Sequence, residues 1–169
     1  MKITSQEEYG LRCLLQLARA KRSLTIPDIA AAEGLSVPYV AKLLSVLRQA
    51  GLVDSERGRT GGYRLAGTPS DVSLGQVLLV LGERHFDEPA YCQKHAGSES
   101  HDGNCVHHGG CTLRALWGTL EQWMRNALDR ITLADLLQSE GGITELLRSR
   151  LAETVLEPAS PLITLTLER

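Results

Sequence analysis

The chain has 169 residues, of which 43% are hydrophobic and 22% are charged. This is the composition of an ordinary globular protein with one full-sized domain or two small ones. The longest uninterrupted apolar run, Val77–Leu81, is far too short to cross a bilayer. The first ten residues include acidic side chains and no apolar segment of the kind found in secretory signals. We therefore expect a cytoplasmic protein with no membrane partner.

The charges are divided unevenly along the chain. Residues 1–70 hold ten lysines or arginines against six acidic residues, whereas the remaining residues hold eight against fourteen. A basic N-terminal part joined to an acidic remainder favours a polyanionic partner at one end of the molecule only.

The N-terminal segment is predicted to be a helix over Gln6–Ala20. Ser5 and Glu8 have the spacing of a capping box, and apolar residues then recur at helical intervals. Cys13 lies within this apolar run, where a lone cysteine is usually a small buried hydrophobic residue. We expect Cys13 to be inert.

Two shorter helices are predicted to follow. Thr25 is expected to cap the first, which ends at Gly34, and Ser36 is expected to cap the second, which ends at Gly51. The second helix has an apolar stripe with the 3.6-residue period, formed by Val40, Leu43, Leu44 and Leu47. Two helices joined by a tight turn predict a helix-turn-helix.

The segment after Gly51 predicts a two-stranded wing. Leu52 and Val53 begin the first strand, glycines form the turn, and Tyr63–Leu65 forms the return strand. The basic and polar residues at the tip are Arg57, Arg59 and Thr60, with Arg64 on the return strand. Such a tip suits a phosphate backbone or a narrow minor groove. An ordinary solvated hairpin is the alternative interpretation.

A long helix is predicted from Leu113 to Ile131. A short apolar helix comes earlier in the chain, and a polar segment separates the two helices. Ser73 and Gln76 have the spacing of a capping box at the start of this short helix, which ends at Leu81. Apolar residues recur at intervals of three and four along the long helix, for about five turns. Too little chain remains to cover this stripe, so we expect two copies to pair as a homodimer. Packing within one chain is the alternative.

The polar segment, residues 83–111, holds three of the four cysteines and all five histidines. It has too little apolar surface to order itself, and clustered cysteines in a reducing compartment are typical of metal ligands or redox sensors. Cys92, Cys105 and Cys111 supply three thiolates, the ligands that iron–sulfur clusters prefer. A zinc site and a disulfide switch between Cys105 and Cys111 are alternatives.

The C-terminal part carries weaker signals. Thr132 is expected to cap the LADLL segment, and Gly141 and Gly142 are expected to interrupt the chain before a last helical pattern. The tail after Pro161 alternates like a strand. No phosphate loop, nucleophile motif or dinucleotide fingerprint is present, so we expect no enzyme activity.

Together these features predict a mainly α fold with a small β wing: a winged helix-turn-helix domain plus a long dimerisation helix. Residues 1–70 form the DNA-binding domain in this prediction. Residues 71–137 form the connecting helix, the cysteine sensor loop (83–111) and the dimerisation helix. Residues 138–169 form an extension without an assigned role.

The segments MKITSQEEYGLRCLLQLA, AGLVDSERGRTGGYRLA and TLADL resemble the Rrf2 family of bacterial winged-helix regulators, which includes IscR-like and NsrR-like proteins. The resemblance spans roughly residues 1–137. It implies a homodimeric transcription factor, usually a repressor, that binds a pseudo-palindromic operator in double-stranded DNA. It also implies an iron–sulfur cluster of two or four irons that senses redox, iron or nitric oxide status.

The resemblance assigns roles to particular positions. The start of the recognition helix and the wing tip are expected to face DNA, through Ser36, Tyr39, Lys42, Arg57, Arg59 and Thr60. A core position is the alternative for Tyr39, because family members carry a tyrosine there whatever their operator. The cluster is expected on Cys92, Cys105 and Cys111, although C-x12-C-x5-C has a longer first interval than relatives usually have. We expect the intact cluster to order the loop and so set the spacing of two DNA-reading heads.

The resemblance leaves the fourth cluster ligand open. IscR-like members have a histidine shortly after the last cysteine, but Thr112, Leu113 and Arg114 follow Cys111 here. NsrR-like members use a carboxylate from helix one of the partner chain, and Glu8 matches that position. A histidine of the loop, His107 or His108, is the alternative. A small iron–sulfur or thiol oxidoreductase and a plain protein-binding adaptor are the rival functions.

Overall fold

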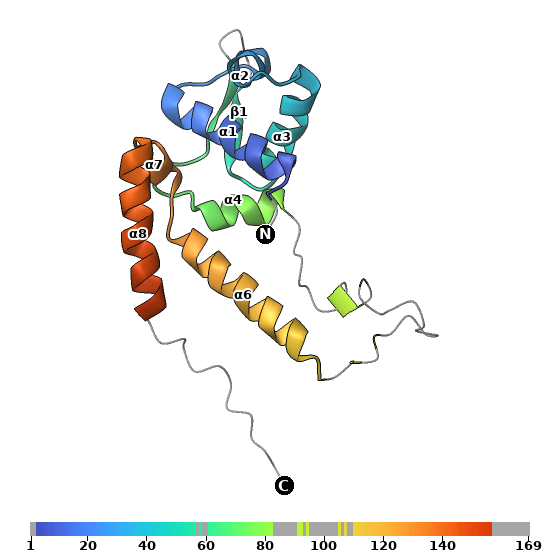
Figure 1. Ribbon diagram of the computed structural model, residues 1–169. Helices are drawn as coiled ribbons and strands as arrows, with labels where there is room; N and C mark the ends of the chain where they lie inside the picture. Colours follow the sequence, from blue (N-terminus) through green and yellow to red (C-terminus); the bar gives the residue numbers. More distant parts are fainter. Residues whose placement is uncertain are drawn as a thin grey trace.

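The computed structural model describes residues 3–56, 58, 61–82, 91, 92, 94, 105, 107 and 110–156. In chain order the elements are α1 (Ser5–Ala20), α2 (Ile26–Glu33), α3 (Val37–Gln49), β1 (Val53–Glu56), β2 (Gly62–Leu65), α4 (Leu74–Leu81), α6 (Thr112–Asp129), α7 (Leu133–Leu136) and α8 (Glu140–Leu156). The fold is mainly helical with one small antiparallel sheet, as predicted (Figure 1).

The first turn of α1 is capped one residue earlier than the sequence predicted. The Thr4 hydroxyl accepts a hydrogen bond from the Glu7 backbone N–H, and the Glu7 carboxylate accepts one from the Thr4 N–H at 2.7 Å. The predicted box of Ser5 and Glu8 is therefore wrong. Two overlapping pairs have the required spacing, and the Thr4 register lets the Glu7 side chain pack against Gly82. Glu8 is left exposed, without a capping role.

The helix-turn-helix is formed as predicted. Thr25 and Asp28 make the capping box of α2, and Gly34 ends that helix in the left-handed region at φ 66°. Ser36 occupies the N-cap of α3, but its hydroxyl makes no capping hydrogen bond. The predicted stripe is fully buried, with Val40, Leu43, Leu44 and Leu47 all 0% exposed.

The two predicted strands form the base of the wing. Val53 pairs with Leu65 in the antiparallel register, and Leu24 exchanges two backbone hydrogen bonds with Tyr63. A Cβ atom on Gly62 would lie 2.5 Å from the Leu24 carbonyl oxygen, so this close approach requires glycine. The predicted tip residues Arg57, Arg59 and Thr60 lie outside the described residues.

One hydrophobic core joins the N-terminal helices to α4 and α7. It includes Val77 and Leu81 of α4 and Leu133 of α7, each at most 3% exposed. Ser73 caps α4 through the Gln76 N–H, as predicted. The Leu133 N–H also donates to the Val72 carbonyl, so the chain returns to this head after α6.

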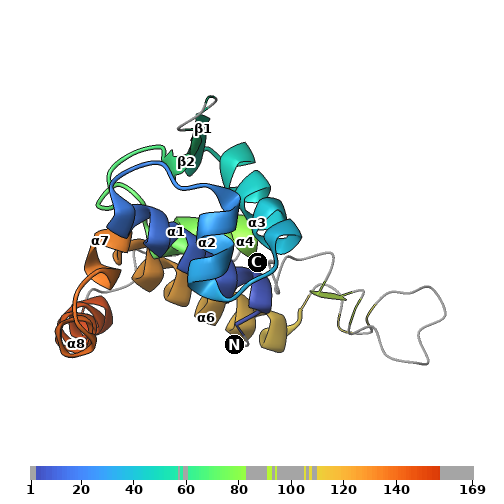
Figure 2. The same cartoon turned by 90° about the horizontal axis from the view of Figure 1, so that it is seen from above.

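The C-terminal end of the long helix α6 lies at the head, and the helix extends away from the head toward its N-terminus (Figure 1). Seen from above, α6 runs beneath the head (Figure 2). Its 18 residues confirm the predicted five turns. Ser73 donates a hydrogen bond to Asp129 at 3.3 Å, and Gly75 approaches the same carboxylate closely. This end of α6 is therefore anchored on α4 by a polar contact.

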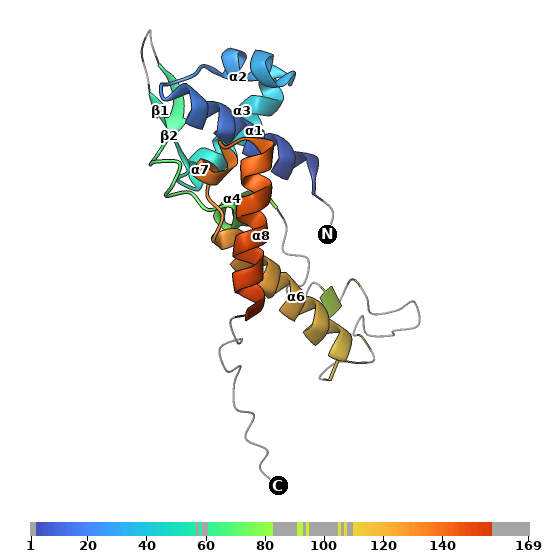
Figure 3. The ribbon, with the colours of Figure 1, turned by 60° about the vertical axis from the view of Figure 1, so that its left-hand side comes forward.

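The last helix, α8, lies beside α6 and α7 (Figure 3). It begins at Glu140, so the predicted interruption at Gly141 and Gly142 is wrong. The Gly142 N–H donates to the Ser139 hydroxyl, which supports a helix start despite the two glycines. The tail beyond residue 156, including the predicted strand, lies outside the described residues.

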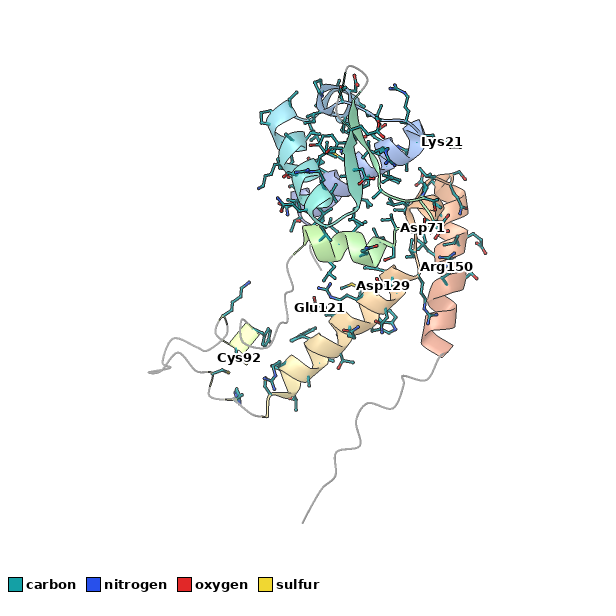
Figure 4. The ribbon with its side chains drawn as sticks, turned by 180° about the vertical axis from the view of Figure 1, so that it is seen from behind. Lys21, Asp71, Cys92, Glu121, Asp129 and Arg150 are labelled. Atoms are coloured by element: carbon teal, nitrogen blue, oxygen red, sulfur yellow. The ribbon has the colours of Figure 1, made fainter. Side chains whose placement is uncertain are left out.

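A partly buried ion pair holds α8 to α7. Arg150 donates to both carboxylate oxygens of Asp135, at 3.0 and 3.4 Å (Figure 4). Burial alone would raise the pKa of Asp135, but hydrogen bonds from Thr132 and the Arg150 charge outweigh it and lower the pKa. The carboxylate is therefore ionised and available to Arg150 at neutral pH.

In the part of the chain that the structure describes, no single helix is both long and apolar enough to cross a bilayer. The pair α2 and α3, bent by 113°, passes the same test of length and composition together. Both helices contribute residues to the buried core of the head.

Candidate DNA-binding surface and cysteine site

Two of the three residues predicted to face DNA on the recognition helix are accessible. Ser36 and Lys42 are exposed, and Val37, between them in sequence, is 47% exposed. The core stripe fixes the rotation of α3, because turning the helix would bring Leu43 and Leu44 out of the core. The structure therefore leaves Ser36 accessible at the N-cap and Lys42 accessible on the side of α3 opposite the core stripe.

Tyr39 belongs to a different environment from these two residues. Its ring meets the ring of Tyr9 edge to face, with 6.1 Å between centroids, and it packs against the core. The Arg12 guanidinium lies 5.4 Å from the centroid of the Tyr9 ring and donates to Glu33 at 2.6 Å. Tyr39 thus joins the recognition helix to the first half of α1, in addition to its predicted place near DNA.

Arg64 on the return strand of the wing is held by carboxylates. Its guanidinium lies 3.2 Å from Asp54 and 2.7 Å from Glu56, which also accepts a hydrogen bond from Ser23. The hydrogen bonds from Ser23 and Arg64 lower the pKa of Glu56, so the pairing carboxylate stays charged at neutral pH. The charge of Arg64 is therefore largely offset within the wing.

Two of the three predicted cysteine ligands converge on one arginine. Cys111 is the N-cap of α6, and its sulfur accepts a hydrogen bond from the Arg114 backbone N–H at 3.4 Å. The Arg114 side chain donates to the second cysteine, with 4.0 Å between Nη1 and the Cys92 sulfur. Both cysteines are half-buried, and Cys92 lies near the end of α6 that is remote from the head (Figure 4).

Of the other predicted ligands, those that the structure describes are not brought to this point. Cys105 is half-buried and His107 is exposed, in a turn where the His107 carbonyl accepts from the Gly110 N–H. Glu8 lies on α1, in the head, and His108 lies outside the described residues. Within the described ranges, no group of three or more cysteine, histidine or acidic side chains is placed to hold a metal ion.

The start of the cysteine segment is attached to α1. The Gln6 side-chain amide donates to the Leu81 carbonyl at 2.8 Å, and a Cβ atom on Gly82 would lie 2.3 Å from a Glu7 carboxylate oxygen. Gly10 packs as closely on the Leu81 side chain. Sequence reasoning missed this attachment because Gln6 and Gly82 are far apart in the chain.

Sequence reasoning also missed Arg114, which it treated only as the absence of a histidine. The available signal was the position of Cys111 immediately before a helical pattern, where a side chain can accept the third backbone N–H of the helix. That N–H belongs to Arg114. The second contact, to Cys92, has no local signal because it crosses the loop.

The family model for Rrf2, described as an iron-dependent transcriptional regulator, matches residues 3–139. This chain belongs to the Rrf2 family. The match confirms the predicted resemblance. Transcriptional regulators of this family bind DNA, and the relatives are regulators rather than enzymes, which confirms the prediction of a non-enzymatic DNA-binding protein.

Individual relatives extend over most of the chain. Protein rrf2 of Nitratidesulfovibrio vulgaris is 36% identical, covering 82% of this chain and 88% of its own, and NsrR of Geobacillus kaustophilus is 35% identical, covering 89% and 99%. Among solved structures, T. potens IscR superposes with a TM-score of 0.62 at 32% identity, covering 81% and 86%. CymR, the global cysteine regulator of B. subtilis, gives 0.61 at 30% identity, covering 80% and 95%.

We predict that Lys42→Ala weakens DNA binding by this Rrf2 protein, because an exposed cation on the recognition helix is lost. The slope of log affinity against log salt concentration should fall by about 1, as for one lost phosphate contact. Arg64→Ala is the matched control, since its charge is already offset by Asp54 and Glu56. Fluorescence anisotropy on DNA selected by the wild-type chain measures both. A larger loss in Arg64→Ala than in Lys42→Ala contradicts this assignment.

Proposed function

We propose that the chain is a homodimeric transcriptional repressor that senses redox, iron or nitric oxide status through an iron–sulfur cluster on Cys92, Cys105 and Cys111. The observation that carries the proposal is the convergence of Cys92 and Cys111 on Arg114 at the start of α6. Relatives named IscR and NsrR support the same reading. In this proposal the protein acts in the cytoplasm and binds a pseudo-palindromic operator.

The donor set suits such a cluster. Thiolates are its preferred ligands, and the positive end of a helix together with a guanidinium favours negatively charged sulfur. Cys92, Cys105 and Cys111 would hold the cluster, which when bound supplies an iron centre that responds to oxidants or nitric oxide. The fourth ligand in this proposal is a Glu8 carboxylate supplied by the second copy of the chain.

The second copy is inferred from the apolar face of α6. Five large apolar side chains on this helix are between 40% and 58% exposed: Leu113, Leu116, Trp117, Leu120 and Trp123. Full burial of a side chain of this size contributes about 1.5–3 kcal/mol. A second α6 presents the same stripe, so a symmetric pairing covers both faces at once.

We predict that Leu120→Asp converts the dimer to a monomer, because a carboxylate in the paired stripe loses its hydration without gaining a partner. Gln122→Asp is the matched control, since Gln122 is exposed on the same helix and bonds only along it, to Asn126. Sedimentation velocity at several concentrations gives the answer. A monomeric wild-type protein, or a Leu120→Asp protein that remains a dimer, contradicts the proposed pairing.

The described contacts support a route from the cysteine segment to the DNA-reading surface. The base of the segment is fixed to α1 through Leu81 and Gln6, and α1 is fixed to α3 through the pair of Tyr9 and Tyr39. Ordering of the cysteine segment would therefore bias the position of each head. Because adjacent major-groove half-sites are about 34 Å apart, a small rotation of the heads changes operator affinity.

We predict that full-length protein purified without oxygen is brown, contains iron and sulfide, and bleaches in air. Its affinity for a selected operator should change by roughly 5- to 150-fold when the cluster is removed, the usual range of coupling between two sites. Fluorescence anisotropy with iron and sulfide assays on the same samples provides the measurement. Equal affinity with and without the cluster rejects the sensing mechanism, and colourless protein with bound zinc rejects the iron–sulfur site.

We predict that substitutions of the two neighbouring acidic residues of α1, Glu7 and Glu8, affect different properties of the protein. Glu8→Gln should alter or abolish the visible spectrum of the cluster while leaving thermal stability unchanged, because Glu8 is exposed and makes no cap. Glu7→Ala should lower the free energy of unfolding by about 0.5–2 kcal/mol, because alanine cannot accept the Thr4 N–H and the capping box is lost. Absorption spectra and thermal melts of both variants test this. An unchanged spectrum in Glu8→Gln excludes this carboxylate as a ligand.

A metal-free thiol switch is the second candidate function. It is favoured by the structural similarity to CymR proteins, including an oxidized form of the Staphylococcus aureus protein at 27% identity with a TM-score of 0.58. The contacts of Arg114 favour Cys92 and Cys111 as the oxidisable pair rather than Cys105 and Cys111. In that case the oxygen-free protein would be colourless and metal-free.

A further inference from the structure

Arg114 contacts both cysteines through different parts of the residue. Its backbone N–H donates to Cys111, whereas its guanidinium reaches Cys92. The backbone bond fixes the first turn of α6 on the Cys111 sulfur, so the side chain starts from a defined position. Cys92 and Cys111 therefore both accept a hydrogen bond from the same residue, Arg114.

We propose that Arg114 is the positioning residue of the cysteine site, which holds Cys92 beside Cys111 and donates a hydrogen bond to each sulfur. The inference rests on the proposed function and assigns this residue a role in regulating the same site. Arginine suits the role because its planar guanidinium carries five N–H donors and remains charged at every relevant pH. Glutamine in its place keeps the backbone bond to Cys111 and removes the charged link to Cys92.

This role predicts how Arg114 acts on a bound cluster. Hydrogen bonds and positive charge at the ligand sulfurs stabilise the reduced form, which is the more negative one, and so raise the reduction potential. Loss of the guanidinium should therefore shift the potential to a more negative value. A purely structural arginine on α6 would change thermal stability without this shift.

We expect Arg114→Gln in the anaerobically purified full chain to have a more negative cluster midpoint potential than wild type, measured by spectroelectrochemical titration. Arg114→Lys should recover part of the shift, because it keeps the charge without the planar fork. Arg125→Gln is the control, since Arg125 lies on the same helix and pairs with Glu121 at 2.5 Å. An unchanged potential in Arg114→Gln, or an equal shift in Arg125→Gln, overturns the inference.

A second measurement uses metal-free protein and therefore remains decisive if no cluster forms and the proposed function fails. Diamide oxidises two thiols to one disulfide and takes up their two electrons and two protons to become a hydrazine. We expect wild-type protein to form the Cys92–Cys111 disulfide several-fold faster than Cys92–Cys105, and Arg114→Gln to lose this preference, as mapped by tandem mass spectrometry. No preference in wild type, or an equal preference in the variant, overturns the inference. If Arg114→Gln does not fold, Arg114→Lys, with a weaker preference than wild type, serves in its place.

Discussion

The close packing of the end of α4 on the first turn of α1 is the constraint on which the rest of the molecule depends. Gly82 lies against the Glu7 carboxylate and Leu81 against Gly10, so neither partner has room for a larger side chain without movement. The same turn receives the Gln6 bond to Leu81. Because α1 also packs on α3, the start of the cysteine segment and the recognition helix share one rigid neighbour.

The head and the region around Cys92 and Cys111 are stabilised by different interactions. The head is ordered by burial, with α1, α3 and α7 contributing side chains that are fully or almost fully buried. Among the residues that the structure describes around Cys92 and Cys111 there is no comparable core, and the two thiols accept hydrogen bonds from Arg114. Net stabilisation from such bonds is modest, so we expect the proposed occupancy or oxidation of the thiols to change local order more around the thiols than in the head.

The sequence was sufficient for the elements whose signals are local. The stripe from Val40 to Leu47, the wing strands and the five turns of α6 follow from periodicity and from glycines at the breaks, and the structure has all of them. The cap of α1 was predicted one residue late because Thr4–Glu7 and Ser5–Glu8 have the same spacing. Only the packing of Glu7 on Gly82, a contact between distant segments, distinguishes the two registers. Arg114 was missed for the same reason, since its contact with Cys92 crosses the loop.

The arginines of the described residues show why net charge alone overstates the positive surface available to DNA. Arg12 is held by Glu33 and Arg64 by Asp54 and Glu56, so two of the cations counted in the basic N-terminal part are already paired. The exposed pairs of Arg64 contribute at most about 1 kcal/mol to stability, but they cancel charge at short range. The positive potential of the head must then come from cations outside such pairs, of which Lys42 is placed on the exposed side of the recognition helix. In the proposed homodimer, operator affinity therefore depends on how the spacing of the two heads places these cations on the DNA phosphates.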